Sequence, residues 1–317
     1  MDDFRGKLAV ITGAGSGMGR ELALQLVAAG AHVALCDVFD DTLSEARAAC
    51  EVAANDGARV STHVCDVSKE GDVVAFRDAV VAAHGGKRVN LLFNNAGTGG
   101  GGSFVLDDRT RWERTFNTNW FGVYYCTRAF LPLLIASSEA CIVNTSRVNG
   151  FFAYGPGGPS TAYSASKFAV KGFTEALLSD LRLNAPHVHV VLVMPGHIGT
   201  AIAQNTMRSQ READPALLVT DFANARRNLE RGGVSLAGMS EEQVIELLQQ
   251  RADAFRDKAP VSAAQAATIM LDAVKQKRWR VLIGQDAALL DRIVREHPDE
   301  MYEPEFMRVA LAPLAPK

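Results

Sequence analysis

Short apolar runs alternate with segments of helical periodicity over the first 200 residues, and this alternation restricts the fold more than any other feature. The runs have the length of strands, and the segments between them repeat apolar residues every three or four positions. We expect strands near 7–12, 32–37, 59–64, 89–94, 141–145 and 188–193, and helices up to residue 30 and around 41–55, 69–84, 110–136 and 161–183. Strands that alternate with helices predict an α/β fold with a parallel sheet.

The strand signal Val190-Val191-Leu192-Val193 has no polar alternation. Such continuous apolar runs are typical of strands that are covered on both faces. We therefore expect a doubly wound parallel sheet in three layers, with helices on both sides.

Beyond Pro195 the pattern changes to a charged, mostly helical stretch, then a helix at 261–276 and a last strand at 278–283. We expect one domain over residues 1–317. Its parts are a core of about 5–200 and 261–290, a helical insertion of about 200–258 over the carboxyl edge of the sheet, and a tail of about 290–317. The insertion is either a lid over an apolar pocket or a pair of dimer-contact helices.

The composition excludes several classes of protein. A net charge of −3 leaves no basic excess for binding nucleic acid. The charged start of the chain differs from a signal peptide, and no apolar run reaches the roughly 20 residues of a membrane span. Five scattered cysteines indicate reduced thiols. We expect a cytoplasmic protein with neither a nucleic-acid partner nor a membrane anchor.

A glycine-rich turn, Gly13-Ala14-Gly15-Ser16-Gly17-Met18-Gly19, joins the first strand to its helix. The helix dipole and the free backbone amides at such a turn attract an anion, and a pyrophosphate fits it. The spacing is G-x-x-x-G-x-G, since Met18 occupies the place of the third glycine in G-x-G-x-x-G. The turn predicts a dinucleotide site that includes Gly13, Ser16, Gly17, Met18 and Gly19.

Asp37 ends the second strand, where an acid can accept hydrogen bonds from the adenosine ribose. Its carboxylate would repel a 2′-phosphate, and Val38 and Phe39 supply no cation to hold one. The sequence therefore favours NAD over NADP as the cofactor. The alternative is a solvated loop acid or helix cap.

Tyr163 and Lys167 stand four residues apart at the start of a predicted helix, so both side chains lie on one face. A nearby cation lowers the pKa of a phenol and lets it exchange a proton with an alcohol. The pair predicts acid–base chemistry on a hydroxyl or carbonyl group.

Taken in order, several motifs resemble those of the short-chain dehydrogenase/reductase family over residues 5 to 200. They are the glycine turn, Asp66, Asn94-Asn95-Ala96-Gly97, Asn119, Tyr163 with Lys167, and Pro195-Gly196. The resemblance implies a Rossmann-type fold, Tyr163 as the catalytic acid/base, and Lys167 on the nicotinamide ribose. It implies that Asn119 positions a relay water, although this residue can also brace the sheet. It further implies cofactor contacts from Asp66, Val67, Asn95, Ala96, Gly97, Pro195, Gly196, Ile198 and Thr200.

The segment Ile142-Val143-Asn144-Thr145-Ser146-Arg147 departs from the family pattern, because Arg147 stands where a catalytic serine is usual. Neighbouring residues of a strand point to opposite faces, so Ser146 cannot replace that serine without a bulge. Three interpretations stay open: Ser146 still binds the substrate oxygen, Arg147 donates to it instead, or the site is disabled.

We expect an NAD-dependent oxidoreductase that interconverts a secondary alcohol and a ketone, with a bulky hydrophobic substrate. The rival hypothesis is a catalytically impaired NAD-binding protein, which Arg147 alone suggests. His187 and His189 share a strand face but have no further ligand nearby, so no metal site is expected. The resemblance implies a homodimer or homotetramer built through the helices at 110–136 and 161–183.

Overall fold

A computed structural model describes the chain at residues 1, 3–55, 57–86, 88–100, 102–153, 159–213, 222–223, 226–230, 233–310 and 312. Seven parallel strands form one sheet in the order β3-β2-β1-β4-β5-β6-β9. They are β1 (Leu8–Thr12), β2 (His32–Asp37), β3 (Val60–Val64), β4 (Leu91–Asn94), β5 (Ala140–Thr145), β6 (Val188–Pro195) and β9 (Arg280–Ile283). The expected doubly wound α/β fold is confirmed, and all seven strands lie where the sequence predicts them.

The strand order reverses between β1 and β4, which are neighbours in the sheet. The register pairs Ile11 with Phe93, and it pairs Asn94 with Asn144 at the ends of β4 and β5. The carboxyl ends of the strands therefore meet at one edge. In doubly wound sheets ligands bind in the crevice outside that edge, at the reversal of strand order.

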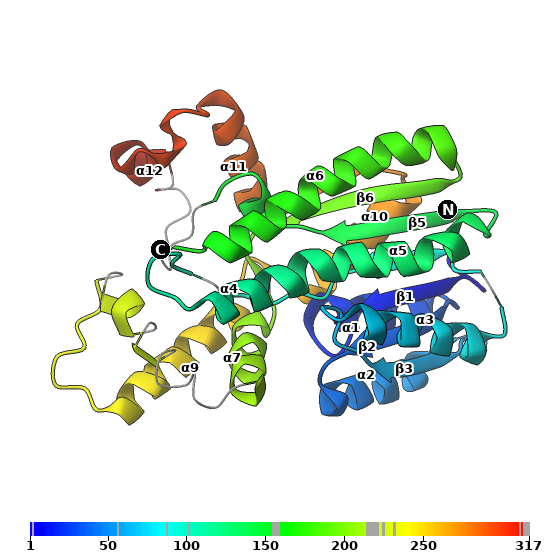
Figure 1. The fold of residues 1–317 in the computed structure, drawn as a ribbon, viewed down its shortest axis with the longest axis horizontal. Helices are drawn as coiled ribbons and strands as arrows, with labels where there is room; N and C mark the ends of the chain where they lie inside the picture. Colours follow the sequence, from blue (N-terminus) through cyan, green and yellow to red (C-terminus); the bar gives the residue numbers. More distant parts are fainter. Residues whose placement is uncertain are drawn as a thin grey trace.

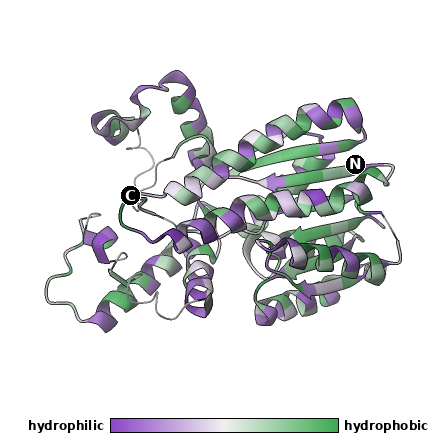
Figure 2. Ribbon diagram, viewed as in Figure 1, coloured by the Kyte–Doolittle hydropathy of each residue, from purple (hydrophilic) through white to green (hydrophobic). Residues whose placement is uncertain are grey.

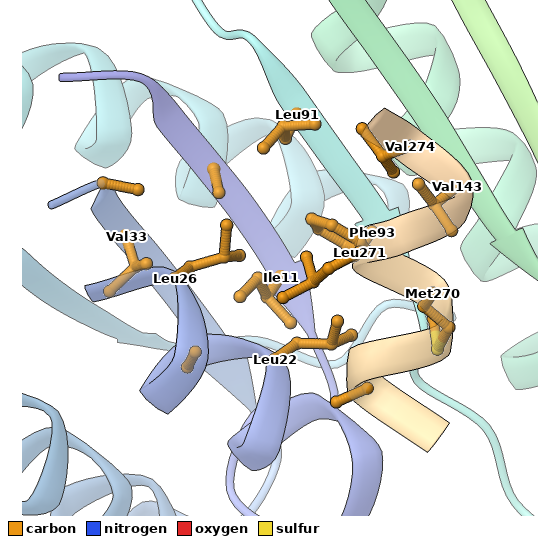
Figure 3. Close-up of a cluster of buried hydrophobic side chains, with 14 of the residues drawn as sticks. Ile11, Leu22, Leu26, Val33, Leu91, Phe93, Val143, Met270, Leu271 and Val274 are labelled. Carbon is orange, nitrogen blue, oxygen red and sulfur yellow. The ribbon is translucent and has the colours of Figure 1, made fainter. Parts of the chain in front are cut away.

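Helices cover both faces of the sheet (Figure 1). One buried cluster joins the sheet to α1 (Gly17–Ala28), α2 (Asp40–Ala53) and α10 (Ala263–Lys275). Figure 3 shows its centre, where Ile11 and Phe93 meet Leu22 of α1 and Leu271 of α10. A second cluster joins the other face to α3 (Glu70–His84), α5 (Gly122–Ile135) and α6 (Thr161–Asn184). The strands are mostly hydrophobic, and polar residues mark the outer faces of the helices (Figure 2).

The helix expected at 110–136 is interrupted. It consists of α4 (Arg109–Phe116), a π-helical turn over Asn117–Phe121, and α5. A π turn contains an extra residue, which changes the direction of the side chains within it. Hydrophobic periodicity does not reveal such a turn, because the residues on both sides of it remain helical.

The insertion begins with β7 (Ile198–Gly199) and α7 (Ile202–Ala213), and it ends with α9 (Glu241–Asp257) and β8 (Val261–Ser262). Ser240 caps α9 through a capping box with Gln243. Residues 214–221, 224–225 and 231–232 of the insertion lie outside the described part of the chain. Helix α11 (Gln285–Glu296) begins before the tail expected at about 290–317, and that tail also contains a 3-10 turn (Glu300–Tyr302) and α12 (Pro304–Ala310).

The five cysteines are all buried and free. Within the described residues, no helix combines the length and the apolar character needed to cross a membrane. The same residues contain no group of three or more His, Cys, Asp or Glu side chains that could hold a metal ion.

Candidate active site

The turn between β1 and α1 depends on glycine. Gly13 and Gly17 have φ angles of +64° and +53°, a region that side chains disfavour. A Cβ on Gly13 would lie 2.7 Å from Cα of Ala96, and one on Gly19 would overlap the carbonyl oxygen of Gly13. The turn therefore packs directly against the backbone after β4. Met18 packs partly buried against the core cluster of this face.

The amino end of α1 opens at this turn. Ser16 is the N-cap residue of α1, yet its side chain makes no capping hydrogen bond. Its hydroxyl instead accepts a hydrogen bond from Nδ2 of Asn205 on α7, at 2.9 Å. Because no side chain caps them, the backbone N–H groups of the first turn of α1 can bind an anion.

Asp37 lies at the carboxyl end of β2, beside the same turn. Its Oδ2 accepts a hydrogen bond from the Gly15 N–H at 2.9 Å, and its Oδ1 accepts one from the Phe39 N–H at 3.2 Å. Burial raises the pKa of this carboxyl, and the backbone hydrogen bonds oppose that rise. Val38, the next residue, is exposed.

The segment after β4 lies between the glycine turn and the side chains of Asn119 and Lys167. Thr12 Oγ1 accepts hydrogen bonds from the backbone N–H groups of Asn95 and Ala96, at 3.1 and 3.0 Å. A Cβ on Gly97 would lie 3.1 Å from Oδ1 of Asn119 and 3.5 Å from Nζ of Lys167. Gly97 therefore leaves the space in which these two side chains approach each other.

Asp66 and Val67, two of the predicted cofactor contacts, also make contacts within the protein. Asp66 Oδ1 accepts hydrogen bonds from the backbone N–H and the hydroxyl of Ser68, at 3.0 and 2.7 Å. The Val67 side chain is buried and packs close to Gly122 at the start of α5. These contacts fix the turn after β3 at the edge of the crevice.

Tyr163 and Lys167 converge on one face of α6. Lys167 Nζ lies 5.7 Å from the centre of the Tyr163 ring, and it donates a hydrogen bond to the Thr145 carbonyl at 3.0 Å. Burial and the positive charge of Arg147 lower the pKa of Lys167 to about 7. Burial raises the pKa of Tyr163, and the charge of Arg147 opposes that rise.

Ser146 and Arg147 occupy different environments. Ser146 is 1% exposed, and its hydroxyl donates a hydrogen bond to the Lys167 backbone carbonyl at 2.8 Å. Arg147 is partly exposed, in extended backbone, and its charge acts on both Tyr163 and Lys167. The Ser146 hydroxyl is thus engaged by the backbone of α6, whereas Arg147 is the more exposed of the two residues.

Asn119 is fully buried within the π turn. Its Oδ1 accepts a hydrogen bond from the Thr98 N–H at 2.8 Å, and its Nδ2 donates to the Thr98 carbonyl at 2.9 Å. Nδ2 also donates to Ser166 Oγ on α6 at 3.2 Å. This side chain therefore links the segment after β4 to the helix that carries Tyr163.

The segment after β6 closes the site from the opposite side. Pro195 ends the strand, and Ile198 is buried. A Cβ on Gly196 would overlap the carboxylate of Asp286, whose Oδ2 accepts a hydrogen bond from the His197 N–H at 2.6 Å. Thr200 lies against Gly17, since a Cβ on that glycine would be 3.2 Å from the Thr200 side chain.

Two contributors to the site are absent from the predictions. Asp286, in the first turn of α11, supports the segment after β6 from nearly 90 residues away. Helix α7 reaches the glycine turn through Asn205. An acid two residues after Gly284 is the local signal for the first, and periodicity gives none for the second.

Comparisons with known proteins agree with this geometry. Residues 7–211 match the short chain dehydrogenase family. The Mycobacterium tuberculosis protein named "Putative oxidoreductase SadH" is 43% identical over 205 residues, which span 65% of this chain and 71% of that protein. Two solved structures add to the likeness.

A short chain dehydrogenase/reductase of Burkholderia phymatum, solved in complex with NAD, has a TM-score of 0.76 and 31% identity, and the match covers 96% of this chain and 98% of that one. A metagenomic short-chain oxidoreductase, solved in complex with NADP, has a TM-score of 0.54 and 34% identity over 61% of this chain and 83% of its own. The sheet order, the glycine turn and the family match together lead to one conclusion: this chain belongs to the short-chain dehydrogenase/reductase family of oxidoreductases.

Proposed function

We propose that this protein is an NAD-dependent oxidoreductase that interconverts a secondary alcohol and a ketone, with Tyr163 as its proton-transferring residue. The observation that carries the proposal is the convergence of Tyr163 and Lys167 on one face of α6, beside Arg147. These side chains lie at the carboxyl edge of the sheet, next to the segment after β4.

The residues present fit a dinucleotide cofactor. The uncapped amino end of α1 is suited to the pyrophosphate. Asp37 keeps free lone pairs on both carboxylate oxygens, which can accept hydrogen bonds from the adenosine ribose hydroxyls. This acid is the reason to prefer NAD. Lys167 would hold the nicotinamide ribose, and Asn95, Ala96 and Gly97 would support the central part of the cofactor. When bound, the cofactor supplies a hydride donor or acceptor.

Proton transfer is assigned to the Tyr163 hydroxyl. In the oxidation direction the phenolate accepts the alcohol proton, and in the reduction direction the phenol returns it to the carbonyl oxygen. At neutral pH Lys167 is only partly charged, because its pKa is lowered to about 7. Arg147 is a second cation whose charge acts on Tyr163.

We assign to Arg147 the oxygen-binding role that a serine usually has. A guanidinium cannot relay a proton, but its N–H groups can stabilise a substrate oxygen that gains negative charge. Ser146 is the weaker candidate, because its hydroxyl is buried and bonded to the backbone of α6. Asn119 acts as a positioning residue through Thr98 and Ser166.

The substrate is expected to be bulky and hydrophobic, and the α7–α9 segment is expected to cover it as a lid. We also propose a homodimer or homotetramer assembled through α4, α5 and α6, in the cytoplasm, where five unpaired thiols would remain reduced. A cofactor-binding protein without turnover is the rival function, but it gives no reason for the Tyr163–Lys167 pair.

The test measures NADH formation with a panel of bulky secondary alcohols. We expect activity in the unmodified protein and a loss of roughly 10²–10⁴-fold in Tyr163→Phe, which should still bind NADH in a fluorescence titration. The Arg147→Ser variant is assayed beside them. Activity in that variant alone would show that the protein is a dinucleotide-binding member of the family without turnover.

A further inference from the structure

Helix α7 lies across the carboxyl edge of the sheet, between α9 and the core (Figure 1). Asn205 bonds to Ser16 in the glycine turn, and Thr206 Oγ1 accepts a hydrogen bond from the Gly99 N–H at 2.9 Å. One helix thus contacts both sides of the crevice. A cavity of about 320 Å³ lies between α7 and α9, and its lining includes Gln204, Arg208, Glu212 and Gln249.

Arg208, one turn after Asn205, reaches the adenosine end of the same crevice. Its guanidinium carbon lies 4.0 Å from the centre of the Phe39 ring, in cation–π geometry. Phe39 is two residues beyond Asp37, and the positive charge of Arg208 acts on the Asp37 carboxyl. The end of β2 and the residues directly after it contain no cationic side chain, so Arg208 supplies the positive charge at this position.

Two other acids hold this arginine. Arg208 Nη1 lies 2.9 Å from Oδ2 of Asp41, and its Nε lies 2.8 Å from Oε1 of Glu212. The hydrogen bond from Arg208 lowers the pKa of Asp41. The four groups Asp37, Asp41, Glu212 and Arg208 together carry three negative charges and one positive charge.

We propose that Arg208 is a specificity-determining residue of the dinucleotide site, available to a 2′-phosphate but kept from it by Asp41 and Glu212. The inference rests on the proposed function, because it concerns the same cofactor site. A guanidinium binds phosphate oxygens through paired hydrogen bonds, and the Asp41 and Glu212 carboxylates take these donors. Because the guanidinium donors are engaged, a 2′-phosphate would meet a net negative surface. NAD, which has no 2′-phosphate, is therefore the preferred ligand.

The family relatives solved with NAD and with NADP indicate that the fold accommodates either cofactor. In this chain the choice is then made by a cluster that brings α2 and α7 together, in addition to Asp37. The stacking of Arg208 on Phe39 also fastens α7 over the crevice, so the same contact holds the proposed lid at its adenosine end.

The experiment compares four proteins: the unmodified chain, Asp41→Asn with Glu212→Gln, Arg208→Met, and the triple variant. Dissociation constants for NADH and NADPH are measured by calorimetry, without substrate, and thermal melting checks that each variant is folded. We expect the NADPH/NADH ratio of dissociation constants to fall at least about tenfold in the double variant, as one charge-assisted contact would give. The fall should disappear in the triple variant.

The ratio of the two dissociation constants distinguishes cofactor selectivity from lid closure. Loss of the Arg208–Phe39 contact alone would weaken the binding of NADH and NADPH equally and leave the ratio unchanged. An unchanged ratio in the double variant would overturn the proposal. The proposal would also be overturned if the ratio fell as far in the triple variant as in the double variant, because Asp41 and Glu212 would then act by repulsion alone. If the unmodified protein binds neither cofactor, the proposed function itself fails. If it binds NADH normally, an unchanged ratio in the double variant or an equal fall in the triple variant rejects only the role of Arg208.

Discussion

Burial and charge act in opposite directions on the Tyr163 hydroxyl. Burial raises its pKa and Arg147 lowers it, so removing the charge should raise the pKa further. We predict that in Arg147→Met the acid limb of the pH profile for alcohol oxidation moves to higher pH, because phenolate then forms only at higher pH. Arg147→Lys, which keeps a cation, is the matched control. A profile that does not move in the Met variant would remove Arg147 from the site.

Asp37 gives a second prediction at the scale of a single residue. Asp37→Ala removes an acceptor for the ribose hydroxyls and the charge that repels a 2′-phosphate. We expect NAD to bind at least about tenfold more weakly, with a much smaller change for NADP, as titration of both cofactors would show. Equal weakening of the two would indicate that Asp37 only supports the turn through Gly15.

The position of a candidate residue can be predicted from the sequence when it is set by near neighbours. Tyr163 and Lys167 are one helical turn apart, and Asp37 follows directly from the end of a strand. Arg208 and Asp286 were not predicted, because each reaches the site from an element far along the chain. Only the packing of α7 and α11 brings them there. The choice between Ser146 and Arg147 likewise depends on the backbone carbonyl of α6.

At the scale of elements, the π turn over Asn117–Phe121 joins the crevice to α6. Asn119 satisfies both backbone groups of Thr98, and these groups lose their partner if the side chain is cut back. We predict that Asn119→Ala lowers the free energy of unfolding by about 1–3 kcal/mol, measured by urea denaturation. An unchanged value in the Ala variant would contradict the bracing role.

The strands and most helices follow from apolar periodicity, which is a local property of the chain. The π turn does not, because the residues on both sides keep the 3.6-residue repeat and only the backbone hydrogen bonds change. The sequence also does not predict helices α11 and α12. Leu290 of α11, Met301 of the 3-10 turn and Phe306 of α12 belong to a cluster with Phe152 that is separate from the main core.

At the scale of the whole molecule, one partly buried ion pair joins the C-terminal segment to the sheet. Asp291 of α11 and Arg280 of β9 are only 14% and 16% exposed, and Arg295 also contacts the carboxylate. Burial alone would raise the pKa of Asp291, but the hydrogen bonds from Arg280 and Arg295 outweigh it and lower the pKa. The ionised carboxylate is thus favoured in the folded protein.

This shift predicts a pH-dependent contribution to stability. Because the pKa is lower in the folded state, the contribution is complete above the unfolded value of about 3.9 and is lost as the pH falls through the folded value. We expect Asp291→Asn to lower the free energy of unfolding by about 1–2 kcal/mol at neutral pH, with the difference shrinking below about pH 4. Denaturation curves at both pH values test this, and a pH-independent difference would contradict it.

The insertion leaves and rejoins the core at a two-residue parallel ladder, where Ile198 pairs with Val261 and Gly199 with Ser262. This ladder fixes the distance between the two ends of residues 200–260, whatever lies between them. Loop-closure entropy grows only with the logarithm of length, so doubling such a segment costs about 0.6 kcal/mol. Segments of other lengths and sequences can therefore be grafted at this point while the sheet and the Tyr163 helix stay folded. Such an exchange would also replace the contacts of α7 with the glycine turn and with Phe39, so the cover of the crevice and the cofactor contacts would change together.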